Sequence, residues 1–172
     1  MKGILFTVLL CFGFAAHCQE LQLSKIDTTQ YFDFWVGKWK ATYDEGNGVQ
    51  QYGINTIDKI LDGTVVRETF ELDEGQNKGF KGTSISVYQP QLKRWKQAWA
   101  DNQGGYFDFE GEFIGDKRIF KTQIFERGEK RIQQRMVFYN IKHDSFTWDW
   151  ELSSDGGKTW ALSWRILYER ID

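Results

Sequence analysis

Residues 31–43 read YFDFWVGKWKATY, and the rest of the chain is best interpreted outward from this stretch. Gly37-Lys38-Trp39 follows a dense aromatic cluster, which predicts a short helical turn leading into the first strand of a closed β-barrel. The eight tryptophans form four local pairs, at positions 35/39, 95/99, 148/150 and 160/164. Side chains an even number of residues apart on a strand share a face. We therefore expect both rings of each pair to point into the barrel.

Ten runs of strand length are separated by short turns rich in Gly, Asn and Asp, and helical periodicity is almost absent. Connections this short join antiparallel neighbours, and closing the sheet removes its two unpaired edges. The sequence thus predicts an all-β fold, a closed up-and-down antiparallel β-barrel of eight to ten strands. The predicted strands span residues 34–44, 49–60, 64–72, 80–88, 94–101, 105–113, 118–126, 130–140, 145–152 and 159–170.

The first 18 residues have the pattern of a signal peptide, with Lys2 preceding an apolar run over residues 4–16. Cleavage before Gln19 would leave a polar lead (19–30) and a barrel domain (31–172), exported to the periplasm or the extracellular space. The alternative is a lipid-modified Cys18, as in bacterial lipoproteins. Both cysteines, Cys11 and Cys18, precede Gln19, so no disulfide or thiolate nucleophile is expected in the mature domain.

Composition excludes several function classes. The formal charge is -2 with acids and bases interspersed, so nucleic acid is not an expected partner. The apolar run near the N-terminus is too short for a transmembrane span. Beyond the predicted signal peptide His143 is the one histidine, and it falls in a predicted turn. We therefore expect no metal, no cofactor and no Ser-His-Asp triad. The sequence predicts no particular oligomeric state.

Three segments together resemble a family of small exported bacterial proteins with a lipocalin-like (calycin) barrel and no established activity. They are FDFWVGKW (32–39), RWKQAWADNQGGYFDFEGEF (94–113) and SSDGGKTWALSWRILYER (153–170). The resemblance implies a barrel similar to lipocalins and fatty-acid-binding proteins, with the GxW motif at Gly37 and Trp39. It also implies that an arginine of the last strand packs across Trp39. Arg170 shares the predicted inner face of that strand and Arg165 does not, so we expect Arg170.

A second motif, SSDGGKTW at residues 153–160, resembles the Asp-box hairpin of sialidases and related propellers. In such a hairpin Asp155 would accept backbone N–H bonds, Gly157 would supply a positive φ, and Trp160 would pack beneath. A propeller needs many copies of the motif. With a single copy, we expect only a well-made turn.

Four polar side chains fall on faces of predicted strands that are otherwise aromatic or apolar: Glu68, Gln97, Asp101 and Gln134. They would lie in the interior with Trp95, Trp99, Trp148 and Trp150. A buried carboxylate is costly unless it is paired, hydrogen-bonded or protonated, so these residues are candidates for ligand binding. The alternative is structural, with Asp101 capping the turn at residues 102–105 and Glu68 near a wet barrel mouth.

These residues support two main hypotheses. The first is an exported binding module whose aromatic-lined cavity holds a small hydrophobic or aromatic molecule, oriented by Glu68, Gln97 and Gln134. The second is an isomerase, cyclase or hydrolase for a lipophilic substrate, with Glu68 or Asp101 as the proton carrier. A carbohydrate-binding surface would require Trp95 or Trp160 to lie outside the barrel, contrary to their predicted orientation.

Overall fold

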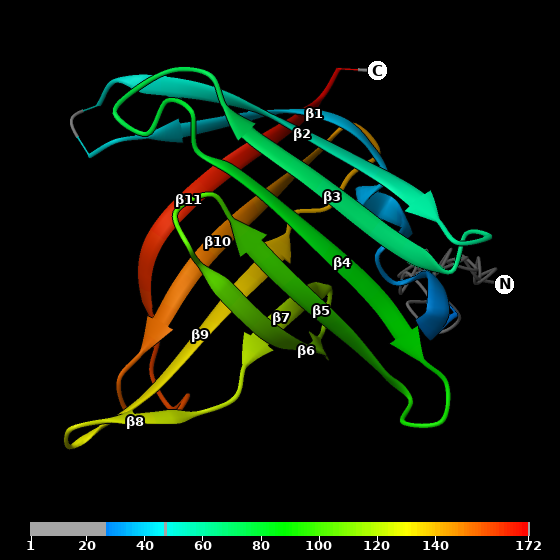
Figure 1. Ribbon diagram of the computed structural model, residues 1–172, viewed down its shortest axis with the longest axis vertical. Coiled ribbons are helices and arrows are strands. Elements are labelled where there is room, and N and C mark those ends of the chain that lie inside the picture. Colours follow the sequence, from blue (N-terminus) through cyan, green and yellow to red (C-terminus); the bar gives the residue numbers. More distant parts are fainter. Residues whose placement is uncertain (1–26, 47, 172) are drawn as a thin grey trace, which may run out of the picture.

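The computed structural model describes residues 27–46 and 48–171, which form an all-β barrel with two short 3₁₀ helices before the first strand (Figure 1). The predicted signal peptide and the cysteines Cys11 and Cys18 lie outside the described residues. The helices are η1 (Thr28–Gln30) and η2 (Asp33–Trp35). The strands are β1 (Gly37–Asp44), β2 (Gln50–Ile60), β3 (Val65–Leu72), β4 (Lys81–Gln89), β5 (Arg94–Asp101), β6 (Tyr106–Ile114), β7 (Lys117–Thr122), β8 (Phe125–Arg127), β9 (Lys130–Tyr139), β10 (Ser145–Ser153) and β11 (Ala161–Arg170).

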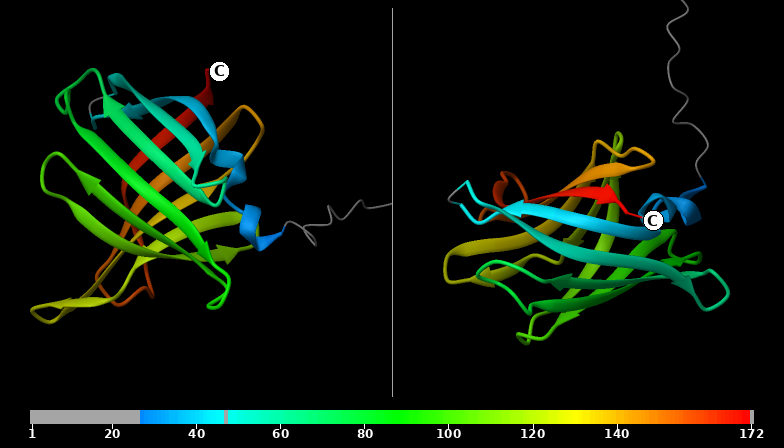
Figure 2. Two further views of the ribbon diagram at one scale, coloured as in Figure 1. Left: turned by 45° about the vertical axis from the view of Figure 1, so that its right-hand side comes forward. Right: turned by 90° about the horizontal axis from the view of Figure 1, so that it is seen from above.

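Ten of these strands close into a ring, which confirms the predicted up-and-down antiparallel barrel (Figure 2). Each strand pairs with the next, β11 returns to β1, and β10 also pairs with β9. In the described chain β8 pairs with β9 alone and lies outside the ring, as part of an arm that projects from the barrel (Figure 1). Closure leaves the ten ring strands without a free edge.

Two predicted strands differ from the observed ones. The first strand begins at Gly37 rather than at residue 34, because Asp33–Trp35 form η2. Gly37 makes the change of direction at φ 139°, a value that side chains disfavour. The predicted strand 118–126 divides into β7 and β8, because the chain leaves the ring after Thr122. There the Thr122 carbonyl accepts a hydrogen bond from Gln133 Nε2 (2.9 Å).

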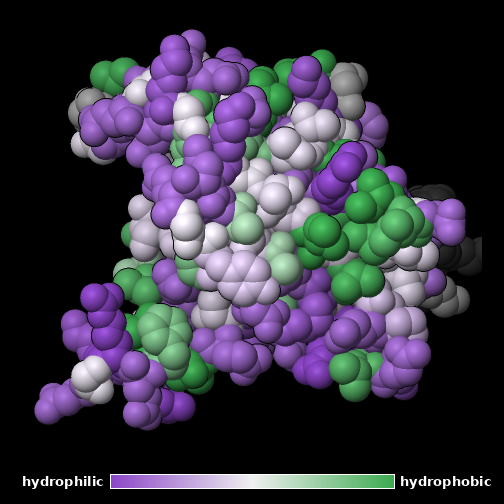
Figure 3. Space-filling model, in the orientation of Figure 1, coloured by the Kyte–Doolittle hydropathy of each residue, from purple (hydrophilic) through white to green (hydrophobic). Residues whose placement is uncertain are grey.

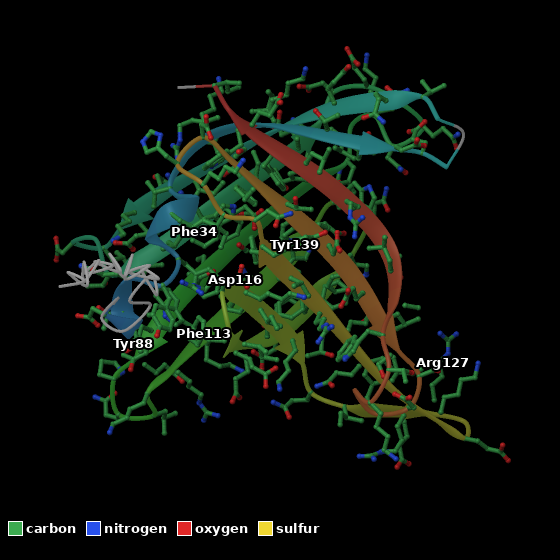
Figure 4. The ribbon with its side chains drawn as sticks, turned by 180° about the vertical axis from the view of Figure 1, so that it is seen from behind. Phe34, Tyr88, Phe113, Asp116, Arg127 and Tyr139 are labelled. Atoms are coloured by element: carbon green, nitrogen blue, oxygen red, sulfur yellow. The ribbon has the colours of Figure 1, made fainter. Side chains whose placement is uncertain are left out.

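The N-terminal segment closes one end of the barrel. Phe32 and Trp35 are fully buried, and the Phe32 ring stacks on Phe120 with centroids 4.3 Å apart. Phe34 of η2 and Phe113 of β6 lie at the same end (Figure 4). The indole N–H of Trp39 donates to the Trp35 carbonyl (2.8 Å). This end is therefore filled by the protein's own aromatic side chains.

Arg170 fastens the seam where the first and last strands meet. It lies opposite Trp39 in the β1–β11 register, and its Cζ is 4.1 Å from the Trp39 ring centroid, so the expected contact is present. Arg170 also donates to the carbonyls of His143 (2.9 Å) and Val36 (3.0 Å). Arg165 instead forms a two-point pair with Asp149, at 2.7 Å for both bonds. Parity along β11 thus identified the correct arginine.

The start of β11 corrects the predicted orientation of Trp160. Trp150 lies opposite Trp164 but Glu151 lies opposite Leu162, so Ser163 is an extra residue in β11. Such a bulge moves every residue before it to the other face. Accordingly Leu162 is half exposed, and the Trp160 ring lies 3.9 Å from Cζ of Arg135, whose outward side chain pairs with Glu151 (2.6 Å).

The SSDGGKTW segment forms the turn that its sequence predicts. Asp155 Oδ1 accepts from the backbone N–H groups of Lys158 and Thr159, both at 2.9 Å, and Oδ2 accepts from the Thr159 hydroxyl (2.6 Å). Bonds from Thr159 and Ser153 hold the pKa of Asp155 well below its ordinary value. Gly157 has the expected positive φ of 86°. All these bonds are local, so the motif has a structural role here.

Candidate ligand-binding cavity

A cavity of about 180 Å³ occupies the end of the barrel opposite η2. On that side the outline of the molecule is indented between the β1–β2 hairpin and the arm that carries β8 (Figure 3). Most of the lining is aromatic, with two carboxyl side chains. The lining residues are Glu68, Phe70, Phe80, Trp99, Asp101, Phe107, Phe109, Met136, Trp148, Trp150, Trp164, Ile166 and Tyr168.

The aromatic rings of the lining meet mainly edge to face. Trp148 is nearly parallel to Trp150 (10°, centroids 6.4 Å apart) and perpendicular to Trp164 (87°, 5.8 Å). Trp150 is perpendicular to Phe109 (90°, 6.0 Å). Edge-to-face pairs are a favoured arrangement and hold each ring in a defined orientation. The walls are therefore fixed by ring-to-ring packing.

Gly82 makes room for one wall of the cavity. It lies opposite Asp101 on β5, and a Cβ at this position would collide with the six-membered ring of Trp99. The Trp99 ring thus lies directly against the backbone of β4. Phe80 flanks it with its ring tilted 22° from Trp99. The position of Trp99 depends on a residue without a side chain.

Glu68 provides the polar group deep in the cavity. It lies two residues before Phe70 on β3, which runs toward the mouth, and its side chain is buried. Its Oε1 accepts from Asn55 Nδ2 (2.8 Å) and its Oε2 from the Ser84 hydroxyl (2.7 Å). Burial raises the pKa of Glu68 to about 7, and the two hydrogen bonds oppose that rise only in part. Near neutral pH both the protonated and the ionised form of this carboxyl group are therefore populated.

A network of neutral groups holds Glu68 in place. Gln97 Nε2 donates to Ser84 Oγ (3.2 Å) and to Ser86 Oγ (2.9 Å), and Asn55 Nδ2 also donates to the Tyr168 hydroxyl (3.3 Å). Burial, and secondly the charge of Glu68, raise the pKa of Tyr168 well above its ordinary value. Among the described residues Asn55 Oδ1 and Gln97 Oε1 are buried without a hydrogen-bond donor. The network therefore retains unused acceptors beside the acid.

Asp101 has the opposite character at the rim. Burial raises its pKa, but bonds from Gly105 N (2.8 Å), Trp99 Nε1 (3.2 Å) and Gln103 N (3.0 Å) outweigh burial, and its pKa lies below the ordinary value. Asp101 thus caps the turn after β5, as the structural alternative predicted. It is also a lining residue, so the cavity has one ionised carboxylate at the rim and one readily protonated carboxyl at depth.

The structure brings together five of the eight predicted ligand-binding residues: Glu68, Trp99, Asp101, Trp148 and Trp150. The other three lie elsewhere. Trp95 is buried at the closed end, where its Nε1 donates to the Thr28 carbonyl (2.7 Å). Gln97 points inward between Trp95 and Trp99 on β5, but it bonds to Ser84 and Ser86 and does not line the cavity. Gln134 precedes Met136 by two residues on β9 and is not among the lining residues.

Several functional candidates were not predicted. Phe70, Phe107, Phe109 and Tyr168 line the cavity, although none of them is among the predicted ligand-binding residues. Asn55 and Ser84 gave no signal, because a polar residue on a strand becomes informative only when its neighbour across the sheet is known. The pairing of β2 with β3 and of β3 with β4 places both beside Glu68.

Within residues 27–46 and 48–171, no group of three or more His, Cys, Asp and Glu side chains is arranged to hold a metal ion. The same part of the chain contains no helix that is long and apolar enough to span a membrane.

Comparison with known proteins adds little. No protein-family model matches the chain, and no curated protein matches it in sequence. The solved structures that resemble it include a protein of unknown function from the DUF3598 family of Nostoc punctiforme PCC 73102. That match has 9% identity and a TM-score of 0.26, and covers 86% of this chain and 100% of the other. A likeness this distant carries no argument, so any function must be inferred from this chain's own residues.

Proposed function

We propose that the protein is a lipocalin-like binding barrel that holds a small hydrophobic or aromatic molecule. The observation that carries this proposal is the asymmetry of the barrel: one end is filled by η1 and η2, and the other keeps a cavity walled by aromatic rings with Glu68 at depth. Ligand sites in proteins are typically apolar and concave, with few but well-placed polar groups. An apolar cavity of about 150 Å³ is large enough to bind benzene, so about 180 Å³ suits a compact ligand.

Adjacent residues on β11 supply a matched test. Ile166 lines the cavity, whereas Leu167 is half exposed on the outer face. Ile166→Phe should extend a ring into the cavity and reduce its free volume, and Leu167→Phe should leave the cavity unchanged. We expect toluene, indole and neopentylbenzene to alter the tryptophan fluorescence of the wild type and of Leu167→Phe, with at least about tenfold weaker binding to Ile166→Phe. Equal binding to both variants, or no binding to the wild type, would contradict the proposal.

The second candidate is an acid/base enzyme for a lipophilic substrate, and one observation favours it. Glu68 lies at the bottom of the cavity with a pKa of about 7, which suits a proton carrier at neutral pH. Asp101 is committed to the turn after β5 and is a poor alternative. The two functions differ in the fate of the ligand. A bound compound recovered unchanged after long incubation supports binding, whereas a converted product that disappears in Glu68→Gln supports catalysis.

We also propose that the chain is exported, on the basis of the signal-peptide pattern in residues 1–18. Intact-mass measurement of the protein from cell fractions tests this point. A chain that starts at Gln19 in the periplasm or medium supports cleavage. A diacylglyceryl mass increment on Cys18 supports the lipoprotein alternative, and an intact N-terminus in the cytoplasm contradicts both.

A further inference from the structure

The charges of the cavity are of one sign. Of the described residues that line it, two are acidic, Glu68 and Asp101, and none is Lys, Arg or His. An anionic ligand such as a fatty acid would bury its carboxylate without a counter-charge. A neutral ligand would leave the charge of Asp101, and that of Glu68 when it is ionised, without a counter-charge in the cavity. These charges favour a ligand that is apolar over most of its surface and positively charged at one point.

The geometry points to an organic cation, and we propose that this cavity binds an amine or quaternary ammonium group carried on a compact apolar body. This inference rests on the proposed binding function and specifies the class of ligand. The negative faces of aromatic rings attract a cation that lies within about 6 Å of the ring centroid, and tryptophan is the strongest partner. Trp99, Trp148, Trp150 and Trp164 all line the cavity.

The approach to the cavity has the same sign. An adjoining hollow shares Phe80 and Trp164 with the cavity and includes Asp44 and Glu45, with no basic residue among its described lining. Asp101 stands at the rim with its pKa held down by hydrogen bonds. Acidic groups along an entry path raise the local concentration of cations and disfavour anions. Entry and cavity therefore select for the same charge.

Glu68 adds a dependence on pH. The titratable group that faces it is Tyr168 from β11, while β2 and β4 present the neutral Asn55 and Ser84. A cation beside Glu68 favours the ionised carboxylate, so binding should release a proton. Affinity for a permanent cation should therefore rise between about pH 5.5 and about pH 8, across the pKa of Glu68 near 7. An uncharged ligand should not gain affinity over this range.

Three probes with the same number of non-hydrogen atoms isolate the charge: benzyltrimethylammonium, its uncharged carbon analogue neopentylbenzene, and the anion 3-phenylpropionate. We expect benzyltrimethylammonium to bind at least about tenfold more tightly than neopentylbenzene at pH 8, and 3-phenylpropionate not to bind measurably. Glu68→Gln should weaken the cation about tenfold and change neopentylbenzene less than about threefold. The control is Glu71→Gln, on the outer face of β3, where Glu71 pairs with Lys81.

The outcomes separate this inference from the binding function. If neopentylbenzene binds as tightly as the cation, the inference is overturned while the binding function stands. If Glu68→Gln and Ile166→Phe both bind the cation as tightly as the wild type does, its site is not this cavity and the inference is likewise overturned. If no probe binds to the wild type, both proposals fail.

Discussion

The two ends of the barrel are both rich in aromatic residues, but one end is packed and the other encloses a cavity. At the closed end, Phe32 and Trp35 interlock with rings from the strands, and the indole N–H groups of Trp39 and Trp95 bond to carbonyls of the N-terminal segment. At the open end, Trp148, Trp150 and Trp164 enclose a cavity instead of filling it. The open end also buries Glu68, a group that costs stability. Aromatic content alone therefore does not distinguish a packed core from a candidate binding site. The open end differs from the closed end in its unfilled space and its buried acid.

Two phenylalanines give the largest expected contrast. Phe32 at the closed end is fully buried, whereas Phe80 at the mouth is only partly buried. Phe32→Ala should lower the free energy of unfolding by about 3–5 kcal/mol, and Phe80→Ala by only about 1 kcal/mol, since less packing is lost there. Urea unfolding followed by circular dichroism measures both values. Similar losses at the two positions would mean that the open end is packed like a core.

Glu68→Gln should stabilise the protein above neutral pH. The folded pKa of about 7 exceeds the ordinary 4.5, so the folded state holds this proton more tightly than the unfolded state. The contribution of Glu68 to the free energy of unfolding is therefore fully present below pH 4.5. It falls as the pH rises, and the loss is complete above pH 7. At pH 8 the variant should gain about 2–3 kcal/mol over the wild type, and near pH 4 almost nothing.

Unfolding midpoints in urea at several pH values measure this effect. Glu71→Gln is the control, because its half-exposed ion pair with Lys81 should contribute less than about 1 kcal/mol without the same pH dependence. A Glu68→Gln variant that is less stable than the wild type at pH 8 would contradict this prediction. It would show that hydrogen bonds to the ionised carboxylate fully offset the cost of burying its charge.

Arg170→Lys should cost about 1–2 kcal/mol of unfolding free energy, because lysine keeps the charge but loses the planar fork that covers Trp39 and reaches the carbonyls of Val36 and His143. Arg67→Lys is the comparison: Arg67 forms a two-point pair with Asp58 that is exposed on both sides, so its loss should cost less than about 1 kcal/mol. Thermal unfolding of the two variants compares them directly. Equal losses would remove the special role assigned to the seam at the closed end.

Gly82→Ala should act on the site more specifically than on stability, at a cost of about 1–3 kcal/mol. The added methyl group collides with the Trp99 ring, which must shift, and we expect it to shift into the cavity that it lines. We expect a changed near-ultraviolet circular dichroism signal and weaker binding of neopentylbenzene. Ser86→Ala, on the same strand at a position that does not line the cavity, is the comparison. An unchanged cavity in Gly82→Ala would show that Trp99 is free to relocate elsewhere.

The sequence predicted the barrel and its seam well because both depend on alternation along single strands. Parity selected Arg170 over Arg165, and it identified Glu68 as an inward acid. It failed at Trp160, because the extra residue Ser163 reverses the faces of β11 and no residue type marks a bulge. It also failed to separate Trp95 from Trp99, which share a face of β5 but lie toward opposite ends of the barrel.

The remaining errors concern partners across the sheet. Gln97 points inward as predicted, but Ser84 and Ser86 of the neighbouring strand take up its amide. Strand register determines such pairings, and a single sequence does not reveal it. The split of 118–126 into β7 and β8 also involves a neighbouring strand: β7 ends at Thr122, whose carbonyl accepts a hydrogen bond from Gln133 of β9.

A structure determined with benzyltrimethylammonium bound at about pH 8 tests the central claim most directly. We predict that its ring lies among Trp99, Trp148 and Trp150, with the ammonium group within about 6 Å of a tryptophan ring centroid and facing Glu68. The closed end should be unchanged. A cavity that remains empty at saturating probe, or a probe that sits on the outer surface, would contradict the claim that this open end is a binding site.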